Sequence, residues 1–266
     1  VRRDYLFMTE PILEARGLRK AFGGLVAVED VRFGVSAGAM HSIIGPNGAG
    51  KTTLFNLLSG RYKPTSGSVI YKGQDISKVP VFQRAQMGIG RSFQITNIFP
   101  NLTVFENARL AAQAHGHDSF RFLRRTSSFR HYEQRAAAVL EITGLSSAAY
   151  QLASALPHGG KRKLELAMIL APDPEIMLLD EPTAGMASEQ VPELMHVIDN
   201  IRQQGGKTIV MVEHNMSVVM SISDKITVMH HGQLLAEGTP LEISSNKVVQ
   251  EVYLGELYDL PGVGSA

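Results

Sequence analysis

The sequence has no cysteine, no long apolar run and almost no net charge, and each absence excludes a class of protein. Without cysteine it forms no disulfide and no thiolate metal site. No apolar run approaches the roughly 18 residues of a bilayer-spanning helix, so we expect a chain that is soluble by itself and reaches a membrane through a partner. The 26 basic and 25 acidic residues give a net charge of +1, which offers nucleic acid no general attraction.

What the chain does contain is a glycine-rich stretch after a short apolar strand at 42–44. Residues 45–52 read GPNGAGKT and fit the pattern G-x-x-x-x-G-K-[ST]. In this pattern backbone N–H groups surround a triphosphate, the lysine reaches the β and γ phosphates, and the hydroxyl offers a ligand to Mg²⁺. A Gly-rich turn is the alternative, but the apolar helix expected at 53–58 favours the phosphate loop. The predicted phosphate-binding residues are Gly45, Pro46, Asn47, Gly48, Ala49, Gly50, Lys51, Thr52 and Thr53.

Periodicity predicts an α/β fold with a parallel core sheet, an N-terminal antiparallel β ribbon and an inserted α-helical lobe. The pattern is strand-like over 12–35, with a turn at Gly23-Gly24, and again in a hairpin at 67–73. The last third alternates continuous apolar strands with helices, which is typical of a parallel sheet buried on both faces. The expected helices are 104–112, 132–142, 163–170, 189–203, 215–221 and two between 240 and 254, and the late strands are 176–179, 207–212 and 226–229.

These elements predict one nucleotide-binding domain over residues 9–256. Its core comprises 9–94 and 171–238, the helical lobe occupies about 95–170, and a helical tail covers 239–256. Apolar residues make up 44% of the chain, which is ample for a core of this size.

Two acidic residues follow the apolar strand at 176–179. Because ligands bind at the carboxyl ends of strands in an open α/β sheet, Asp180 is placed to hold Mg²⁺, and Glu181 to deprotonate a water that attacks the γ-phosphate. An acid capping a helix is the alternative reading. The strand at 207–212 also ends in a polar pair, so His214 emerges at the same edge, where a γ-phosphate contact competes with a structural role.

Two further positions carry weaker signals. Gln94 lies where the core meets the helical lobe, and by itself it is an ordinary loop glutamine. His158, Gly159 and Gly160 precede the helix at 163–170, and glycines at a helix N-terminus make an anion site, although an ordinary helix start explains the isolated signal better. A second phosphate site is explained by a two-fold dimer that holds each nucleotide between the first loop of one subunit and the second loop of the other.

Together these motifs resemble the nucleotide-binding subunit of an ABC transporter over about residues 12–256. The resemblance identifies the first loop as Walker A, 176–181 as Walker B with its catalytic glutamate, Gln94 as the Q-loop glutamine and His214 as the switch histidine. It implies ATP and Mg²⁺, with Thr52, Gln94 and Asp180 at the metal. Phe22 stands where the family's aromatic residue stacks on adenine, although a phenylalanine before a turn is as easily a core residue.

The chain departs from the broad family at two motifs. Pro157 and Gly160 stand at the serine and glutamine positions of the usual signature Leu-Ser-Gly-Gly-Gln, and Ala187 stands where the D-loop commonly ends in aspartate. Gly159 keeps its backbone donor. We therefore expect the second phosphate site to persist without a side-chain hydroxyl.

Within the family, four segments resemble the branched-chain amino acid (Leu/Ile/Val) importers, especially their longer ATP-binding subunit. They are FGGLVAV at 22–28, IFPNLTV at 98–104, VEHNM at 212–216 and YLGE at 253–256. The resemblance implies a cytoplasmic ATPase, peripheral on the inner face of the cell membrane. Its implied partners are a second ATP-binding subunit, identical or different, two transmembrane permease subunits and, indirectly, a periplasmic or extracellular substrate-binding protein, with no nucleic acid.

Other functions fit the same motifs. Similar cassettes import urea, short amides or aromatic acids, and others export lipids. A soluble ABC ATPase acting on DNA or ribosomes is disfavoured, because the chain has neither long coiled-coil heptads nor a second cassette.

Two groups of residues in the predicted lobe have more than one interpretation. The apolar residues Ile95, Ile98 and Phe99 follow Gln94 and are expected to be partly exposed for a partner, with lobe core as the alternative. The basic, aromatic stretch at 120–130 is best interpreted as a solvated helix pair or loop, with packing beside lipid second. It contains Phe120, Arg121, Phe122, Arg124, Arg125, Phe129 and Arg130. Elsewhere, four histidines are too isolated to form metal sites and are better interpreted as turn residues: His115, His117, His230 and His231.

Overall fold

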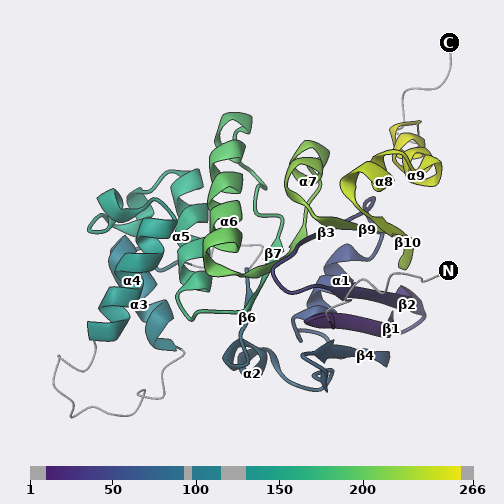
Figure 1. The fold of residues 1–266 in the computed structure, drawn as a ribbon, viewed down its shortest axis with the longest axis horizontal. Helices are drawn as coiled ribbons and strands as arrows, with labels where there is room; N and C mark the ends of the chain where they lie inside the picture. Colours follow the sequence, from purple (N-terminus) through teal and green to yellow (C-terminus); the bar gives the residue numbers. More distant parts are fainter. Residues whose placement is uncertain (1–9, 93–97, 115–129, 259–266) are drawn as a thin grey trace, which may run out of the picture. The chain divides into compact units, whose positions relative to one another are not determined.

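The computed structural model describes residues 10–92, 98–114 and 130–258 (Figure 1). The chain divides into two compact units, the first formed by Val1–Val81 and Val219–Ala266 and the second by Phe82–Val218. The chain passes between them within α2 (Val81–Gln86) and α7 (Met216–Ile222). None of the helices in the described ranges is both long and apolar enough to cross a membrane.

The first unit contains a four-stranded antiparallel sheet in the order β2-β1-β4-β5. Strands β1 (Leu13–Phe22) and β2 (Leu25–Val35) form the predicted ribbon around the turn at Gly23-Gly24. Strands β4 (Ser66–Tyr71) and β5 (Gln74–Asp75) form the predicted hairpin. Buried and exposed residues alternate along much of β1 and β2, as expected of an antiparallel sheet covered on one face.

The first unit also contains β3 (Met40–Ile44), which pairs in parallel with β9 (Lys225–His230). All five residues of β3 are buried, and the chain then enters the glycine-rich loop and α1 (Lys51–Leu58). Strand β10 (Gln233–Gly238) pairs antiparallel with β9 and was not predicted, because its residues do not form a continuous apolar run. Helices α8 (Pro240–Ser244) and α9 (Lys247–Tyr258) are the two predicted tail helices.

The second unit is built on the parallel strands β8 (Thr208–Val212), β7 (Ile176–Asp180) and β6 (Ile89–Arg91), in that order. Every residue of β7 and β8 is buried, which confirms strands covered on both faces. The described residues of this unit also include longer helices, with α3 packed against α4 and α5. They are α3 (Val104–Ala114), α4 (Arg130–Ile142), α5 (His158–Leu170) and α6 (Val191–Gly205), beside the 3-10 turns η2 (Ser146–Ala148), η3 (Ala153–Ala155) and η4 (Ser188–Gln190).

Two of the helix starts that differ from the predictions have a direct physical reason. Helix α5 begins at His158 rather than 163, because Pro157 holds an extended N-cap and the glycines of the first turn carry no apolar pattern. Helix α6 begins at Val191 rather than 189, because Ser188–Gln190 form a 3-10 turn before it.

Candidate active site

The glycine-rich loop in the first unit is fixed against neighbouring backbone. Gly45 has φ 150°, and a β-carbon there would lie 2.2 Å from the carbonyl oxygen of Met229. Gly50 has φ 94°, and a β-carbon there would lie 2.4 Å from the carbonyl oxygen of Ala27. A side chain at either position would collide with β9 or β2, so these two glycines set the path of the loop.

Lys51 and the start of α1 give this loop the properties of an anion site. Lys51 is 5% exposed, and its Nζ donates to the carbonyl oxygens of Gly45 at 2.6 Å and Pro46 at 2.7 Å. The backbone N–H of Leu54 makes the bond to Gly50 that opens the helical ladder, so the N–H groups before it lie at the positive end of the helix dipole. Thr52 is exposed at this end of the helix.

Phe22 is an exposed aromatic residue at the β1–β2 turn. Its side chain is 42% exposed, which removes it from the core. The ring makes an edge contact with Tyr62 at 5.4 Å between centroids, and the Nζ of Lys20 lies 5.0 Å from the Phe22 ring centre. This contact was not predicted, because Tyr62 lies in a loop that has no recognisable sequence pattern. An exposed aromatic ring of this kind can stack on a planar base.

In the second unit, Asp180 ends β7 as a buried carboxylate whose two oxygens have no hydrogen-bond partner within the described ranges. Burial raises the pKa of Asp180, and the Arg91 guanidinium at 4.0 Å opposes that rise. The backbone N–H of Asp180 donates to the hydroxyl oxygen of Ser92 at 2.8 Å, a role that sequence reasoning missed. Carboxylate oxygens at the ligand edge of a parallel sheet are the type of donor that a hard divalent cation prefers.

Glu181 and His214 meet at the carboxyl ends of β7 and β8. The Nε2 of His214 lies 2.7 Å from Oε1 of Glu181, and because an ionised carboxylate only accepts, this nitrogen donates. The backbone N–H of Glu181 donates to the carbonyl oxygen of Val212 at 2.9 Å. The structure thus brings the two residues together as expected from the strand ends. Helix capping does not explain Glu181, since a turn follows it.

Glu213 is a further buried acid at this edge that sequence reasoning left without a role. Oε1 of Glu213 accepts from the backbone N–H of Thr183 at 2.9 Å and from its hydroxyl at 2.7 Å. The available signal was its position at the end of an apolar strand, directly before His214.

The second predicted loop forms the first turn of α5. The bond from the Lys161 N–H to the Pro157 carbonyl oxygen begins the ladder, so the N–H groups of 158–160 precede it. The side chain of the N-cap residue, Pro157, makes no capping bond to them. His158 is exposed, whereas Gly159 is buried, and a β-carbon on Gly159 would lie 3.3 Å from Oε1 of Gln190. The loop therefore has the geometry of an anion site but little room for a side chain at Gly159.

Several predicted positions lie outside the described residues. They are Gln94, Ile95, His115, His117 and the stretch 120–129. Within the described ranges, no group of three or more His, Cys, Asp or Glu residues is arranged to hold a metal ion. The rings of His230 and His231 pack against each other at 3.9 Å.

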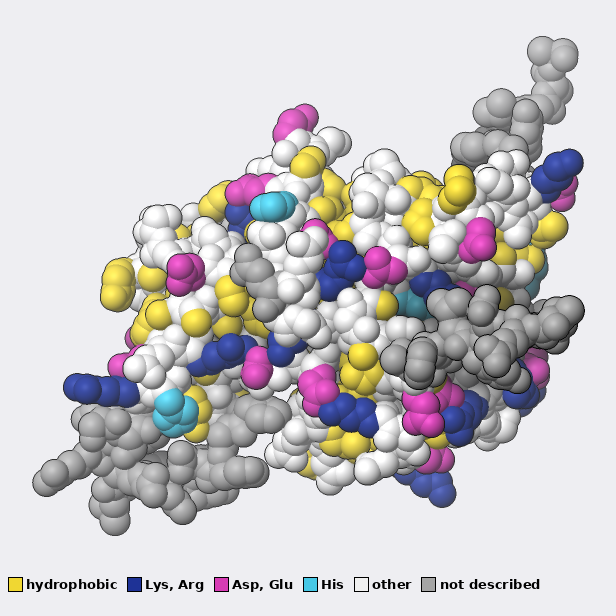
Figure 2. Space-filling model, in the orientation of Figure 1, with side chains coloured by type: hydrophobic (Ala, Val, Ile, Leu, Met, Phe, Trp, Pro, Cys, Tyr) yellow, Lys and Arg dark blue, Asp and Glu magenta, His cyan; other side chains and the backbone are white. Residues whose placement is uncertain are grey.

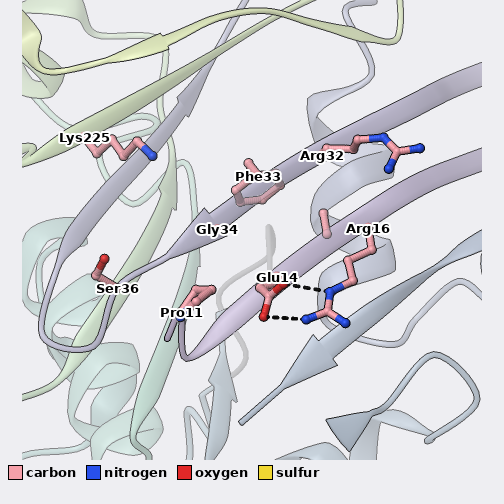
Figure 3. A pocket seen from close by; sticks show the side chains of 9 residues that line it. Pro11, Glu14, Arg16, Arg32, Phe33, Gly34, Ser36 and Lys225 are labelled. Carbon is pink, nitrogen blue, oxygen red and sulfur yellow. Dashed lines mark hydrogen bonds and ion pairs between the residues drawn. The ribbon is translucent and has the colours of Figure 1, made fainter. Parts of the chain in front are cut away.

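A pocket of about 450 Å³ in the first unit is lined by Pro11, Phe33 and charged side chains (Figure 3). Arg16 forms an ion pair with Glu14 at 2.7 Å, which Figure 3 draws as dashed lines. Lys225 forms an ion pair with Glu237. Arg32, which also lines the pocket, pairs with Asp30 at 2.8 Å, so each lining cation has an acidic partner. None of the predicted nucleotide-binding residues lines this pocket.

Comparison with known proteins identifies the class. The family model described as ABC transporter matches residues 28–184, and the model described as Branched-chain amino acid ATP-binding cassette transporter matches residues 233–259. The chain therefore belongs to the ABC transporter family, as an ATP-binding subunit with ATPase activity. The predicted family, fold class and enzyme class are confirmed.

The relatives agree with this assignment. The chain is 42% identical over 254 residues to the high-affinity branched-chain amino acid transport ATP-binding protein LivG of Escherichia coli (strain K12), covering 94% of this chain and 100% of that protein. The solved structure of MJ1267, an ATP-binding cassette of an ABC transporter, has a TM-score of 0.81 and 28% identity, covering 92% of this chain and 99% of that one. A dimeric structure of the cassette MJ0796 bound to ADP and Pi has a TM-score of 0.72 and 25% identity, covering 86% of this chain and 98% of that one.

Proposed function

We propose that this chain is the ATP-hydrolysing subunit of an importer for branched-chain or related amino acids. The Glu181–His214 pair, at 2.7 Å, is the observation that carries the chemistry. Glu181 is the general base that takes a proton from the attacking water, and His214 orients that carboxylate and contacts the γ-phosphate. Lys51 and the backbone N–H groups of its loop bind the β and γ phosphates, and Phe22 stacks on the adenine.

Mg²⁺ fits the donors of this chain. Asp180 supplies carboxylate oxygens that have no hydrogen-bond partner among the described residues, and Thr52 supplies an exposed hydroxyl. Gln94 is assigned to the metal by family resemblance alone. When bound, the ion neutralises charge on the phosphate oxygens. Burial raises the pKa of the Asp180 carboxyl, and a bound cation would oppose that rise because it favours the ionised form.

The subunit acts as a dimer on the inner face of the cell membrane. His158, Gly159 and Gly160 of one copy face the nucleotide held by the phosphate loop of the other, which explains why one chain carries two anion-binding helix starts. The dimeric MJ0796 structure supports this arrangement, and the similarity to LivG supports the branched-chain amino acid cargo. Two transmembrane permease subunits and, indirectly, a substrate-binding protein complete the transporter.

Cargo is tested by reconstituting this subunit with its permease subunits in lipid vesicles. We expect the binding protein loaded with leucine, isoleucine or valine to stimulate ATP hydrolysis several-fold, measured as phosphate release. Urea, a short amide and an aromatic acid are the matched comparisons. Stimulation by one of these compounds alone would reassign the cargo, and a lipid-dependent ATPase that ignores all of them would indicate export.

Phe99 is proposed as a contact with the membrane subunits. Asn107 is fully buried, and its amide accepts from the Phe99 N–H at 2.7 Å and donates to the Phe99 carbonyl at 3.0 Å. The backbone is therefore held while the ring stays 51% exposed. Figure 2 shows other hydrophobic side chains exposed over the lobe helices, and Tyr150 and Leu152 are also exposed, at 87% and 51%.

We expect Phe99→Ala to keep the melting temperature and basal ATPase activity of the isolated subunit while it reduces co-purification with the membrane subunits. Asn107→Ala is the matched control, because it removes the anchor of the loop and leaves backbone groups unpaired, at a cost of about 1–3 kcal/mol of stability. Thermal unfolding and affinity co-purification measure both effects. A large fall in melting temperature with normal partner binding would return Phe99 to the lobe core.

A further inference from the structure

Glu213 is a buried acid that receives hydrogen bonds from two different segments. The residue is 3% exposed. Its Oε1 accepts from the N–H and hydroxyl of Thr183 at 2.9 and 2.7 Å, and its Oε2 accepts from the N–H of His214 at 3.1 Å. A buried carboxylate is costly unless such donors compensate it, so the three bonds hold both segments to one side chain.

The two segments are the ones that carry Glu181 and His214. Thr183 lies two residues after Glu181, and His214 directly follows Glu213. The Glu181 N–H donates to Val212 at 2.9 Å, and the Glu181 and His214 side chains meet at 2.7 Å. With the bonds of Glu213, these contacts close a ring that joins the loop after β7 to the end of β8.

Glu181 needs such support because its backbone is strained. Its φ is 48°, in the left-handed region that residues other than glycine adopt at a cost. A strained residue keeps its conformation only when the surrounding structure over-determines it. The Thr183–Glu213 bonds fix the chain two residues after the strained peptide, and the bond to His214 fixes the partner of the Glu181 side chain.

We propose that Glu213 is a positioning residue, which sets the direction of the Glu181 carboxylate by clamping Thr183 and the backbone of His214. The proposal rests on the proposed function, since it requires Glu181 to act as the base. Glu213 itself touches neither nucleotide nor water in this scheme. Its loss is therefore expected to change turnover rather than ATP binding, because the phosphate loop belongs to a different part of the chain.

Glu213→Gln tests the clamp, because an amide keeps the size of the side chain but offers one acceptor atom where the carboxylate offers two. Either the Thr183 donors or the His214 N–H then faces an NH₂ group. We expect kcat to fall by about 10- to 100-fold, as for a misplaced reacting group. The KM for ATP is expected to stay within about twofold of wild type. An unchanged kcat, or a loss that appears in KM alone, would overturn the proposal.

A double-variant cycle separates positioning from a general loss of stability. In a Glu181→Gln background no base remains to be positioned, so adding Glu213→Gln is expected to lower the residual single-turnover rate by less than about twofold. If Glu213→Gln lowers the rate by the same factor in the Glu181→Gln background as in the wild type, Glu213 acts independently of Glu181 and the proposal is wrong.

Thr183 gives a second test that does not depend on the folding of the Glu213 variant. Thr183→Val removes one donor to Glu213, and we expect a loss of kcat on the order of fivefold, which Thr183→Ser largely restores. Thr143→Val is the matched control, because Thr143 is also buried but its hydroxyl donates to Val139 within the helical lobe, at 2.8 Å. Equal effects of the two valine variants on kcat would contradict the clamp.

The proposed function and the clamp fail in different ways. If wild type and Glu181→Gln hydrolyse ATP equally, the assignment of the base fails and with it the reason for a clamp. If Glu181→Gln is inactive while both Glu213→Gln and Thr183→Val turn over like wild type, the base stands and the positioning role alone is refuted.

Discussion

Glu181→Gln is expected to lower steady-state ATP hydrolysis by about 100-fold or more, the loss typical of a removed general base. The amide keeps an oxygen that can accept from Nε2 of His214, now 2.7 Å from Oε1 of Glu181, so the local geometry is preserved while the proton acceptor is lost. ATP affinity is expected to stay at the wild-type level. The nucleotide-bound dimer should therefore accumulate, which size-exclusion chromatography with ATP and Mg²⁺ detects.

Two further variants separate the loss of the base from a general effect of charge and from a loss of ATP binding. Glu141→Gln makes the same change in charge at an exposed position of α4 and should hydrolyse ATP like wild type. Lys51→Ala removes the buried ammonium of the phosphate loop and should weaken ATP binding itself, measured by equilibrium titration. Hydrolysis by the Glu181 variant within a few-fold of wild type would reject Glu181 as the base.

Gly159→Asp is expected to abolish ATP-driven dimerisation. The glycine lies in the first turn of α5, where a carboxylate would face the γ-phosphate of the partner's nucleotide and repel it. The side chain must also displace Gln190, whose Oε1 would be 3.3 Å from the new β-carbon. The measurement is size-exclusion in the Glu181→Gln background over a range of ATP concentrations.

Gly159→Asn separates charge repulsion from steric displacement, since asparagine has nearly the same shape as aspartate but no charge. We expect the asparagine variant to dimerise at higher ATP concentration than the glycine parent, and the aspartate variant not to dimerise at all. Dimer formation by the aspartate variant at unchanged ATP concentration would place the second phosphate contact elsewhere in the chain.

The glycine-rich loop, the strand ends and the polar pairs were predictable because each depends on residues close together in sequence. The motif G-x-x-x-x-G-K-[ST] predicts the backbone path of its loop directly from the glycine positions. The five consecutive buried residues of β7 and of β8 appear in the sequence as nearly continuous apolar runs. Strand β6, with three residues, was missed because its partner β7 lies far away in the sequence. Strand β10 follows its partner β9 closely, but its partly exposed residues form no continuous apolar run.

The amino-acid sequence by itself determined the phosphate loop, the acidic end of β7 and the family to which the chain belongs, because spacing along one segment encodes all three. Only the tertiary structure decided what Glu213 and Ser92 do, and that the carboxylate oxygens of Asp180 have no hydrogen-bond partner among the described residues. The Thr183–Glu213 bond joins residues 30 positions apart, and the Ser92–Asp180 bond joins residues 88 positions apart. Such contacts arise from the packing of neighbouring parallel strands, which carries no local signature in the sequence.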